Sequence, residues 1–136
     1  MNVSATDELQ EACWPIASLM GKLEKAQEKL TPGTWQYRMV QDNLSALRCA
    51  LDLMRKETSG TNTFTQGDLQ EALRALAVMI SKTDSAKSQR SPGTSQHTLL
   101  QNRLKALRLA EERTRAELEK KGRLAYRNGD EQRSML

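Results

Sequence analysis

Apolar residues recur along this chain at alternating spacings of three and four positions. In the first part they are Leu9, Ala12, Ile16, Leu19, Leu23, Ala26 and Leu30 and, after a Pro-Gly pair, Tyr37, Val40, Leu44, Leu47, Leu51 and Met54. This period places the apolar side chains on one face of an α-helix. The two stripes therefore predict an αα-hairpin whose helices pack against each other along one seam.

The same pattern returns sixty residues later. When each residue is aligned without gaps with the residue sixty positions further on, 18 of the 50 positions from Thr6 to Arg55 are identical. The matches include Pro32-Gly33-Thr34 against Pro92-Gly93-Thr94, a register that biased helical composition does not produce. We predict an internal duplication with a repeat of 60 residues, in which each copy forms one helical hairpin.

The chain is long enough for a single domain, residues 1–136, with its own hydrophobic core. We predict hairpin 1 over 6–57, a linker over 58–65, hairpin 2 over 66–122 and a loosely ordered tail over 123–136. A second apolar stripe beside each seam would face water in a lone hairpin. The predicted fold class is therefore all-α, a four-helix bundle built from two tandemly duplicated αα-hairpins. A second chain could cover the same stripes, which leaves a homodimer open.

The two Pro-Gly pairs mark the ends of helices. Thr31 and Ser91 suit the N-cap position, which would place Pro32 and Pro92 at the first helical residue, where a missing N–H costs nothing. Such tips normally only connect two helices, so a ligand-binding role for either tip is the weaker alternative.

Three further local signals refine the helix boundaries. Thr65 followed by Asp68 matches a capping box and predicts that the third helix starts near Gln66. The fourth helix continues as a charged stretch that we expect to project past the bundle and to end near Gly122. Pro15 interrupts the first helix and predicts either a kink or an end there. The apolar spacing resumes in phase across Pro15, which favours a kink.

Composition limits the function only loosely. The formal net charge is +4 and the isoelectric point about 9.3, which permits contact with nucleic acid or an acidic partner and requires neither. No apolar run is long enough to span a membrane, and the first residues lack the pattern of a secretory signal. We therefore expect a cytoplasmic protein, with Cys13 and Cys49 reduced.

The sequence shows no arrangement typical of catalysis. His97 is the sole histidine, and two cysteines with one distant histidine do not match a zinc site. Phosphate-binding, nucleophile-elbow and metalloprotease motifs are also missing from the sequence. We expect no enzyme activity, no metal and no cofactor. The enzyme alternative would need a cluster of polar groups around His97.

The two halves of the chain differ in charge. Residues 1–60 carry 7 basic and 8 acidic side chains, whereas residues 61–136 carry 14 and 9. The excess in the second half gives a candidate basic patch on hairpin 2: Lys82, Lys87, Arg90, Arg103, Lys105 and Arg108. This region is either a solvated hairpin tip or a surface for phosphates or an acidic protein. It lacks the interleaved aromatic residues on which single-stranded bases stack.

The first half instead concentrates large apolar residues. Trp14, Trp35 and Met39 are the candidate partner-binding residues, although Trp35 could equally cover the end of its hairpin. We therefore predict a non-catalytic protein–protein interaction module, such as an adaptor, an inhibitor or a regulatory subunit, with another protein as its partner. The alternative is a nucleic-acid-associated protein that uses the basic patch on hairpin 2.

Overall fold

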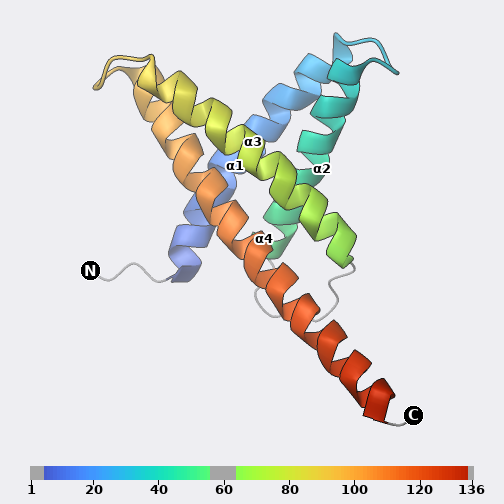
Figure 1. The fold of residues 1–136 in the computed structure, drawn as a ribbon. Helices are drawn as coiled ribbons and strands as arrows, with labels where there is room; N and C mark the ends of the chain where they lie inside the picture. The colour runs from blue at the N-terminus through green and yellow to red at the C-terminus, as the bar shows by residue number, and fades with distance from the viewer. Residues whose placement is uncertain (1–4, 56–63, 135–136) are drawn as a thin grey trace.

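The computed structural model describes residues 5–55 and 64–134, and the side chains of 8–55 and 64–123. These residues form four helices and no strand, so the predicted all-α class is confirmed (Figure 1). The helices are α1 (Ala5–Glu28), α2 (Trp35–Arg55), α3 (Gln66–Ser88) and α4 (Ser95–Ser134). Most of the predicted linker, 58–63, lies outside the described residues.

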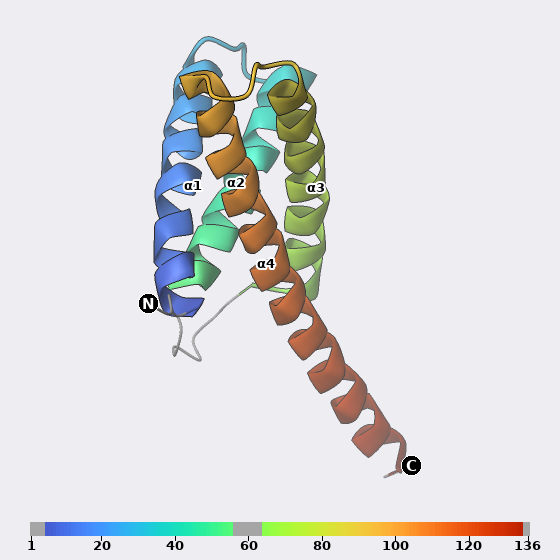
Figure 2. The same ribbon diagram turned by 90° about the vertical axis from the view of Figure 1, so that its left-hand side faces the viewer.

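The helices pack as two hairpins that cross each other. α1 contacts α2 and α3 contacts α4, and contacts between the hairpins join α2 to α3, α1 to α4 and α2 to α4. Figure 1 shows that the two hairpins cross and that their Pro-Gly tips point apart, and Figure 2 gives the view from the side. The fold is a helical bundle in which the inter-hairpin contacts lie where the hairpins cross.

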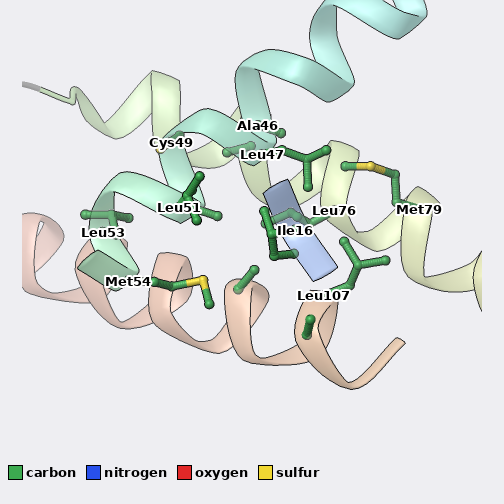
Figure 3. Packing of buried hydrophobic residues seen from close by; sticks show 14 of the residues in the cluster. Ile16, Ala46, Leu47, Cys49, Leu51, Leu53, Met54, Leu76, Met79 and Leu107 are labelled. Carbon is green, nitrogen blue, oxygen red and sulfur yellow. The ribbon is translucent and has the colours of Figure 1, made fainter. Parts of the chain in front are cut away.

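The core lies at this crossing, and its centre holds one large residue of each helix. Ile16, Leu47, Leu76 and Leu107 meet there, and each side chain is fully buried (Figure 3). Around them lie six buried alanines, Ala12, Ala46, Ala50, Ala72, Ala106 and Ala110. Small side chains at a crossing let two helix backbones approach closely, while the four large residues fill the space between them. Members of this core stand sixty positions apart, as Ile16 and Leu76 do.

Both tips differ from the predicted helix starts in the same way. The Thr34 N–H donates to the Thr31 carbonyl at 3.3 Å, and Gly33 has a φ of 92°, which is a type II turn with proline at its second position. Thr34, not Thr31, then caps α2, because its hydroxyl accepts from the Tyr37 N–H at 3.3 Å.

The second tip repeats this geometry. Gly93 has a φ of 90°, and the Thr94 hydroxyl accepts from the His97 N–H at 3.2 Å. The prediction of N-caps at Thr31 and Ser91 is therefore wrong by three residues. The physical reason is that glycine directly after proline favours the turn, because glycine adopts a positive φ at little cost.

The predicted start of α3 is confirmed. The Thr65 hydroxyl accepts from the Asp68 N–H at 3.0 Å, and the Asp68 carboxylate accepts from the Thr65 N–H at 3.0 Å. α1 also runs through Pro15 as one helix, as the unbroken spacing favours.

The predicted end of α4 near Gly122 is wrong, because the helix continues to Ser134 and projects beyond the other three (Figure 1). Gly122 does not adopt the positive φ of a left-handed C-cap. Strong helix formers surround it, and pairs at helical spacing such as Glu111 with Arg115 at 3.7 Å support the extension. Within the described ranges no helix has the length and apolarity needed to cross a membrane.

Candidate functional site

Two grooves lie where the hairpins pack on each other. The α1/α4 groove has a volume of about 300 Å³ and is lined by Glu8, Glu11, Ala12, Trp14, Pro15, Asn102, Lys105, Ala106 and Leu109. The α2/α3 groove has a volume of about 340 Å³ and is lined by Asp42, Ser45, Ala46, Cys49, Phe64, Asp68, Glu71 and Ala72. Each groove thus runs between one helix of hairpin 1 and one helix of hairpin 2.

The two grooves use equivalent positions of the two halves. Seven pairs of lining residues stand sixty positions apart: Glu8/Asp68, Glu11/Glu71, Ala12/Ala72, Asp42/Asn102, Ser45/Lys105, Ala46/Ala106 and Cys49/Leu109. A buried alanine from each helix forms the floor in both cases. The grooves therefore share one architecture and differ in the side chains that line it.

Trp14 and Pro15 set the α1/α4 groove apart. The Trp14 side chain is 79% exposed, the largest exposure among the big apolar residues described. Burial of a tryptophan removes a large apolar area from water, so an exposed one beside a groove is a ready contact point. Pro15 lacks an N–H and cannot donate the helical hydrogen bond to the Glu11 carbonyl, which leaves a backbone acceptor on this wall.

A second hollow continues this groove along α4. It shares Glu8, Asn102, Lys105 and Leu109 with the first and adds Lys87, Gln101, Leu104, Arg108 and Glu112. We refer to both hollows together as the α1/α4 surface. It carries three carboxylates, Glu8, Glu11 and Glu112, and three cations, Lys87, Lys105 and Arg108. None of these six forms an ion pair within the described part of the chain.

The α2/α3 groove is acidic, and two of its three carboxylates are engaged within the chain. It carries Asp42, Asp68 and Glu71 and no lining cation. Asp68 caps α3, and Glu71 pairs with Arg74 at 3.2 Å. Burial, reinforced by Asp68 and other nearby carboxylates, raises the pKa of the Cys49 thiol from 9.0 to about 11. The thiol therefore stays protonated at neutral pH and is a poor nucleophile.

The candidate basic residues do not form one patch. Lys87, Lys105 and Arg108 share the α1/α4 surface. Lys82 instead reaches towards α2, where its Nζ lies 3.9 Å from Sδ of Met39. The remaining two also lie apart from the groove linings: Arg90 is exposed beside the second tip, and Arg103 is half-buried on α4, where desolvation lowers its pKa.

The candidate partner-binding residues are also separated. Trp35 is 69% exposed at the first residue of α2, close to the tip, and lines neither groove. Met39 is half-buried against Lys82. Trp14 alone of the three belongs to a groove. The sequence pattern does not single out Glu8, Glu11 or Leu109 around Trp14, although each stands sixty positions from a residue that lines the α2/α3 groove.

The described side chains show no group of three His, Cys, Asp or Glu placed to hold a metal ion. His97 is half-exposed at the start of α4, away from both grooves. Comparison of the chain with protein-family models, with curated proteins and with solved structures finds no match. The geometry of the α1/α4 surface is thus the basis for assigning a function.

Proposed function

We propose that this protein is a non-catalytic protein–protein interaction module whose contact surface is the α1/α4 surface, centred on Trp14. The observation that carries the proposal is the exposure of Trp14, at 79%, beside a groove with an apolar floor. Tryptophan is enriched among the residues that dominate binding energy at protein interfaces. The groove offers such an anchor together with charged residues at its rim, which is the usual anatomy of a protein contact.

The distribution of charge favours a protein partner over nucleic acid. Nucleic-acid binding needs an uninterrupted basic surface that displaces counterions from many phosphates. On the α1/α4 surface, Lys105 and Arg108 stand among carboxylates such as Glu8 and Glu112, which would repel phosphates. The other three candidate basic residues point elsewhere. Binding of nucleic acid is therefore the outcome that the experiment must exclude.

We extend the proposal to the origin and location of the protein. A duplicated hairpin is supported by the equivalent positions of the two grooves and by the matching hydrogen bonds of the two tips. A reducing compartment such as the cytoplasm is supported by the two cysteines, which are free thiols.

The test is affinity capture from a lysate of the source cells, with the tagged chain as bait. Three baits are compared: the wild-type chain, Trp14→Ala and Trp35→Ala. The second variant is a matched control, because Trp35 is about as exposed but lies outside both grooves. Each capture is run with and without nuclease, at low and at moderate salt.

We expect a stoichiometric protein band that survives nuclease, is lost with Trp14→Ala and is kept with Trp35→Ala. Loss of the band after nuclease treatment would instead support the nucleic-acid alternative. Equal loss with both variants, or with Trp35→Ala alone, would contradict the placement of the contact surface. Thermal unfolding of each variant checks that the fold is kept, and we expect little change because both side chains are exposed.

A further inference from the structure

The wall that α1 gives to the α1/α4 groove is rich in groups that attract a cation. Glu8, Glu11 and Trp14 follow one another at intervals of three residues, which places their side chains next to each other on one side of the helix. Neither carboxylate forms an ion pair within the described ranges. The face of the exposed Trp14 indole carries partial negative charge, and Pro15 leaves the Glu11 carbonyl without its helical donor. An aromatic face, two carboxylates and a carbonyl oxygen therefore meet on one wall.

The other half of the chain shows which side chain a carboxylate at this position takes. Arg74 stands sixty positions after Trp14, and its Nη1 donates to Oε1 of Glu71, the equivalent of Glu11, at 3.2 Å. On α1 a tryptophan stands where α3 has this arginine, and an indole cannot neutralise a carboxylate. The cation that α3 supplies from its own sequence is thus missing from the equivalent position of α1.

The opposite wall of the groove does not replace this cation. There α4 contributes Lys105, which forms no ion pair with either carboxylate in the described part of the chain. Two carboxylates against one ammonium group leave the lining with one net negative charge, whereas the whole chain carries +4. Lys87 and Arg108 line only the adjoining hollow, together with Glu112. The groove beside Trp14 therefore keeps a negative charge that a partner can neutralise.

We propose that this wall binds an arginine side chain of the partner protein, whose guanidinium stacks on the Trp14 indole and donates to the carboxylates of Glu11 and Glu8. The inference rests on the proposed function, since it names the chemistry of the partner at the same groove. The bound guanidinium restores on α1 the pair that Arg74 forms with Glu71 on α3. The segment of the partner that enters the groove thus carries an exposed arginine.

Arginine fits this wall better than lysine does. A guanidinium is planar and stacks on an aromatic face, whereas an ammonium group is a compact and strongly hydrated point charge. Its five N–H donors also point in fixed directions, so one guanidinium can donate to a carboxylate and to the Glu11 carbonyl while it lies on Trp14. The combination of an aromatic face with several acceptors therefore distinguishes between the two basic side chains.

The test uses three small probes and the full chain. N-acetyl-arginine amide carries the guanidinium, N-acetyl-citrulline amide replaces it with a neutral urea group of nearly the same shape, and N-acetyl-lysine amide carries an ammonium group. Each probe is titrated into the isotope-labelled chain at constant ionic strength. Nuclear magnetic resonance follows the backbone N–H of Glu11 and the indole N–H of Trp14, with the indole N–H of Trp35 as an internal control.

We expect the arginine probe to shift the signals of Glu11 and Trp14 and to leave the signal of Trp35 in place. The citrulline probe lacks the charge and is expected to bind at least about tenfold more weakly. The lysine probe keeps the charge but does not stack, so we expect it to bind about threefold more weakly than the arginine probe.

Four variants locate the site. Glu11→Gln is expected to weaken binding of the arginine probe about fivefold, and Glu71→Gln, its matched control on α3, to leave binding unchanged. Trp14→Arg places an arginine beside Glu11 as on α3 and should abolish binding, read from the Glu11 signal. Lys105→Ala removes the cation of the opposite wall and should strengthen binding. Circular dichroism verifies the fold of each variant, and all four substituted side chains are exposed.

Equal binding of the arginine and citrulline probes, equal binding of the arginine and lysine probes, or an unchanged affinity in Glu11→Gln would overturn the arginine proposal. These results are distinct from failure of the proposed function. If no probe binds but lysate capture still depends on Trp14, the interaction module stands and its contact at this groove is not an arginine. If the arginine probe binds as expected and lysate capture fails, the guanidinium site stands and the proposed function is wrong.

Discussion

The α1/α4 and α2/α3 grooves are two versions of one structure. Both have a floor of paired alanines, Ala12 with Ala106 and Ala46 with Ala72, and both have an acidic residue at the start of the flanking helix. They differ in what stands on the wall above Glu11 and Glu71. Trp14 lines the α1/α4 groove at that position, whereas its equivalent on α3, Arg74, does not line the α2/α3 groove.

The exchange of Trp14 for Arg74 changes the chemistry of this position. Arg74 pairs with Glu71 at 3.2 Å, so both charges are satisfied within the helix. Trp14 cannot neutralise Glu11, and it exposes a large apolar ring to solvent. A shared core fixes the position of both grooves, while a few wall residues make their chemistry differ.

The strongest test of the shared core is to remove one large side chain from each half. Leu47→Ala and Leu107→Ala each delete a fully buried residue at the crossing, and each is expected to lower the free energy of unfolding by about 2–5 kcal/mol. Denaturant unfolding measures both. Similar losses would support equivalent halves, whereas a much smaller loss for one variant would show that the crossing depends on one hairpin.

The next largest expected difference is in the reactivity of the two thiols, Cys13 and Cys49. The thiolate is the reactive form, so a pKa near 11 rather than 9.0 lowers the alkylation rate of Cys49 about 100-fold at neutral pH. We expect Cys13, which is less buried, to react first. Mass spectrometry after a short alkylation measures the ratio. Equal labelling of the two cysteines would contradict the burial of Cys49 in the α2/α3 groove.

The same shift predicts how stability depends on pH. Because the folded state raises the pKa of Cys49, its contribution is complete below about pH 9 and is lost as the pH rises to about 11. Between about pH 9 and pH 11 the Cys49 thiol is ionised in the unfolded chain but still protonated in the folded chain, so the rise in pH favours unfolding. The slope should vanish in Cys49→Ala, while the slope of Cys13→Ala should match that of the wild type.

The tips provide a smaller and symmetric effect. Gly33 and Gly93 both have a φ near +90°, and nothing lies within 4 Å of a Cβ built at either position. Substitution by alanine therefore costs only the strain of the backbone conformation, about 1 kcal/mol in each half. Thermal unfolding of Gly33→Ala and Gly93→Ala measures it. Unequal costs would show that the two turns differ in solution.

The smallest effect concerns the wall residues themselves. Arg74→Ala removes an exposed ion pair and is expected to cost at most about 0.5 kcal/mol of stability. Arg74→Trp copies the wall of the α1/α4 groove into the α2/α3 groove at a similarly small cost. If this transplant alone created a second binding site, the charges of the α1/α4 surface would not matter for binding.

The sequence predicted the helices and much of the core. Three-and-four spacing identified all four central residues, because a buried helix face leaves a clear period in the sequence. The ends of the helices were predicted less accurately than their buried faces. A Pro-Gly pair fits a turn as well as a helix start, so the N-caps lie at Thr34 and Thr94 and not at Thr31 and Ser91. Gly122 lies inside a long charged helix and does not end it.

The grooves could not be predicted in the same way. The residues that line the grooves lie between the buried seam and the solvent, where the apolar period is weak. The position of each groove also depends on how the two hairpins cross, which the period of a single helix does not give. The candidate basic residues share a short segment of sequence, but successive helical positions point in different directions, so Lys82 and Lys105 face different neighbours. Trp14 was singled out by residue type alone.

The most direct test of the central claim is the solvent exposure of Trp14 in the free chain and in its complex with the captured partner. Acrylamide quenching of Trp35→Phe reports Trp14 alone, and the matched variant Trp14→Phe reports Trp35. We predict that quenching of Trp14 falls when the partner obtained by lysate capture is added, because the partner covers Trp14, while quenching of Trp35 stays constant. Constant quenching of Trp14, or protection of Trp35 instead, would contradict the proposal that the α1/α4 surface is the contact surface.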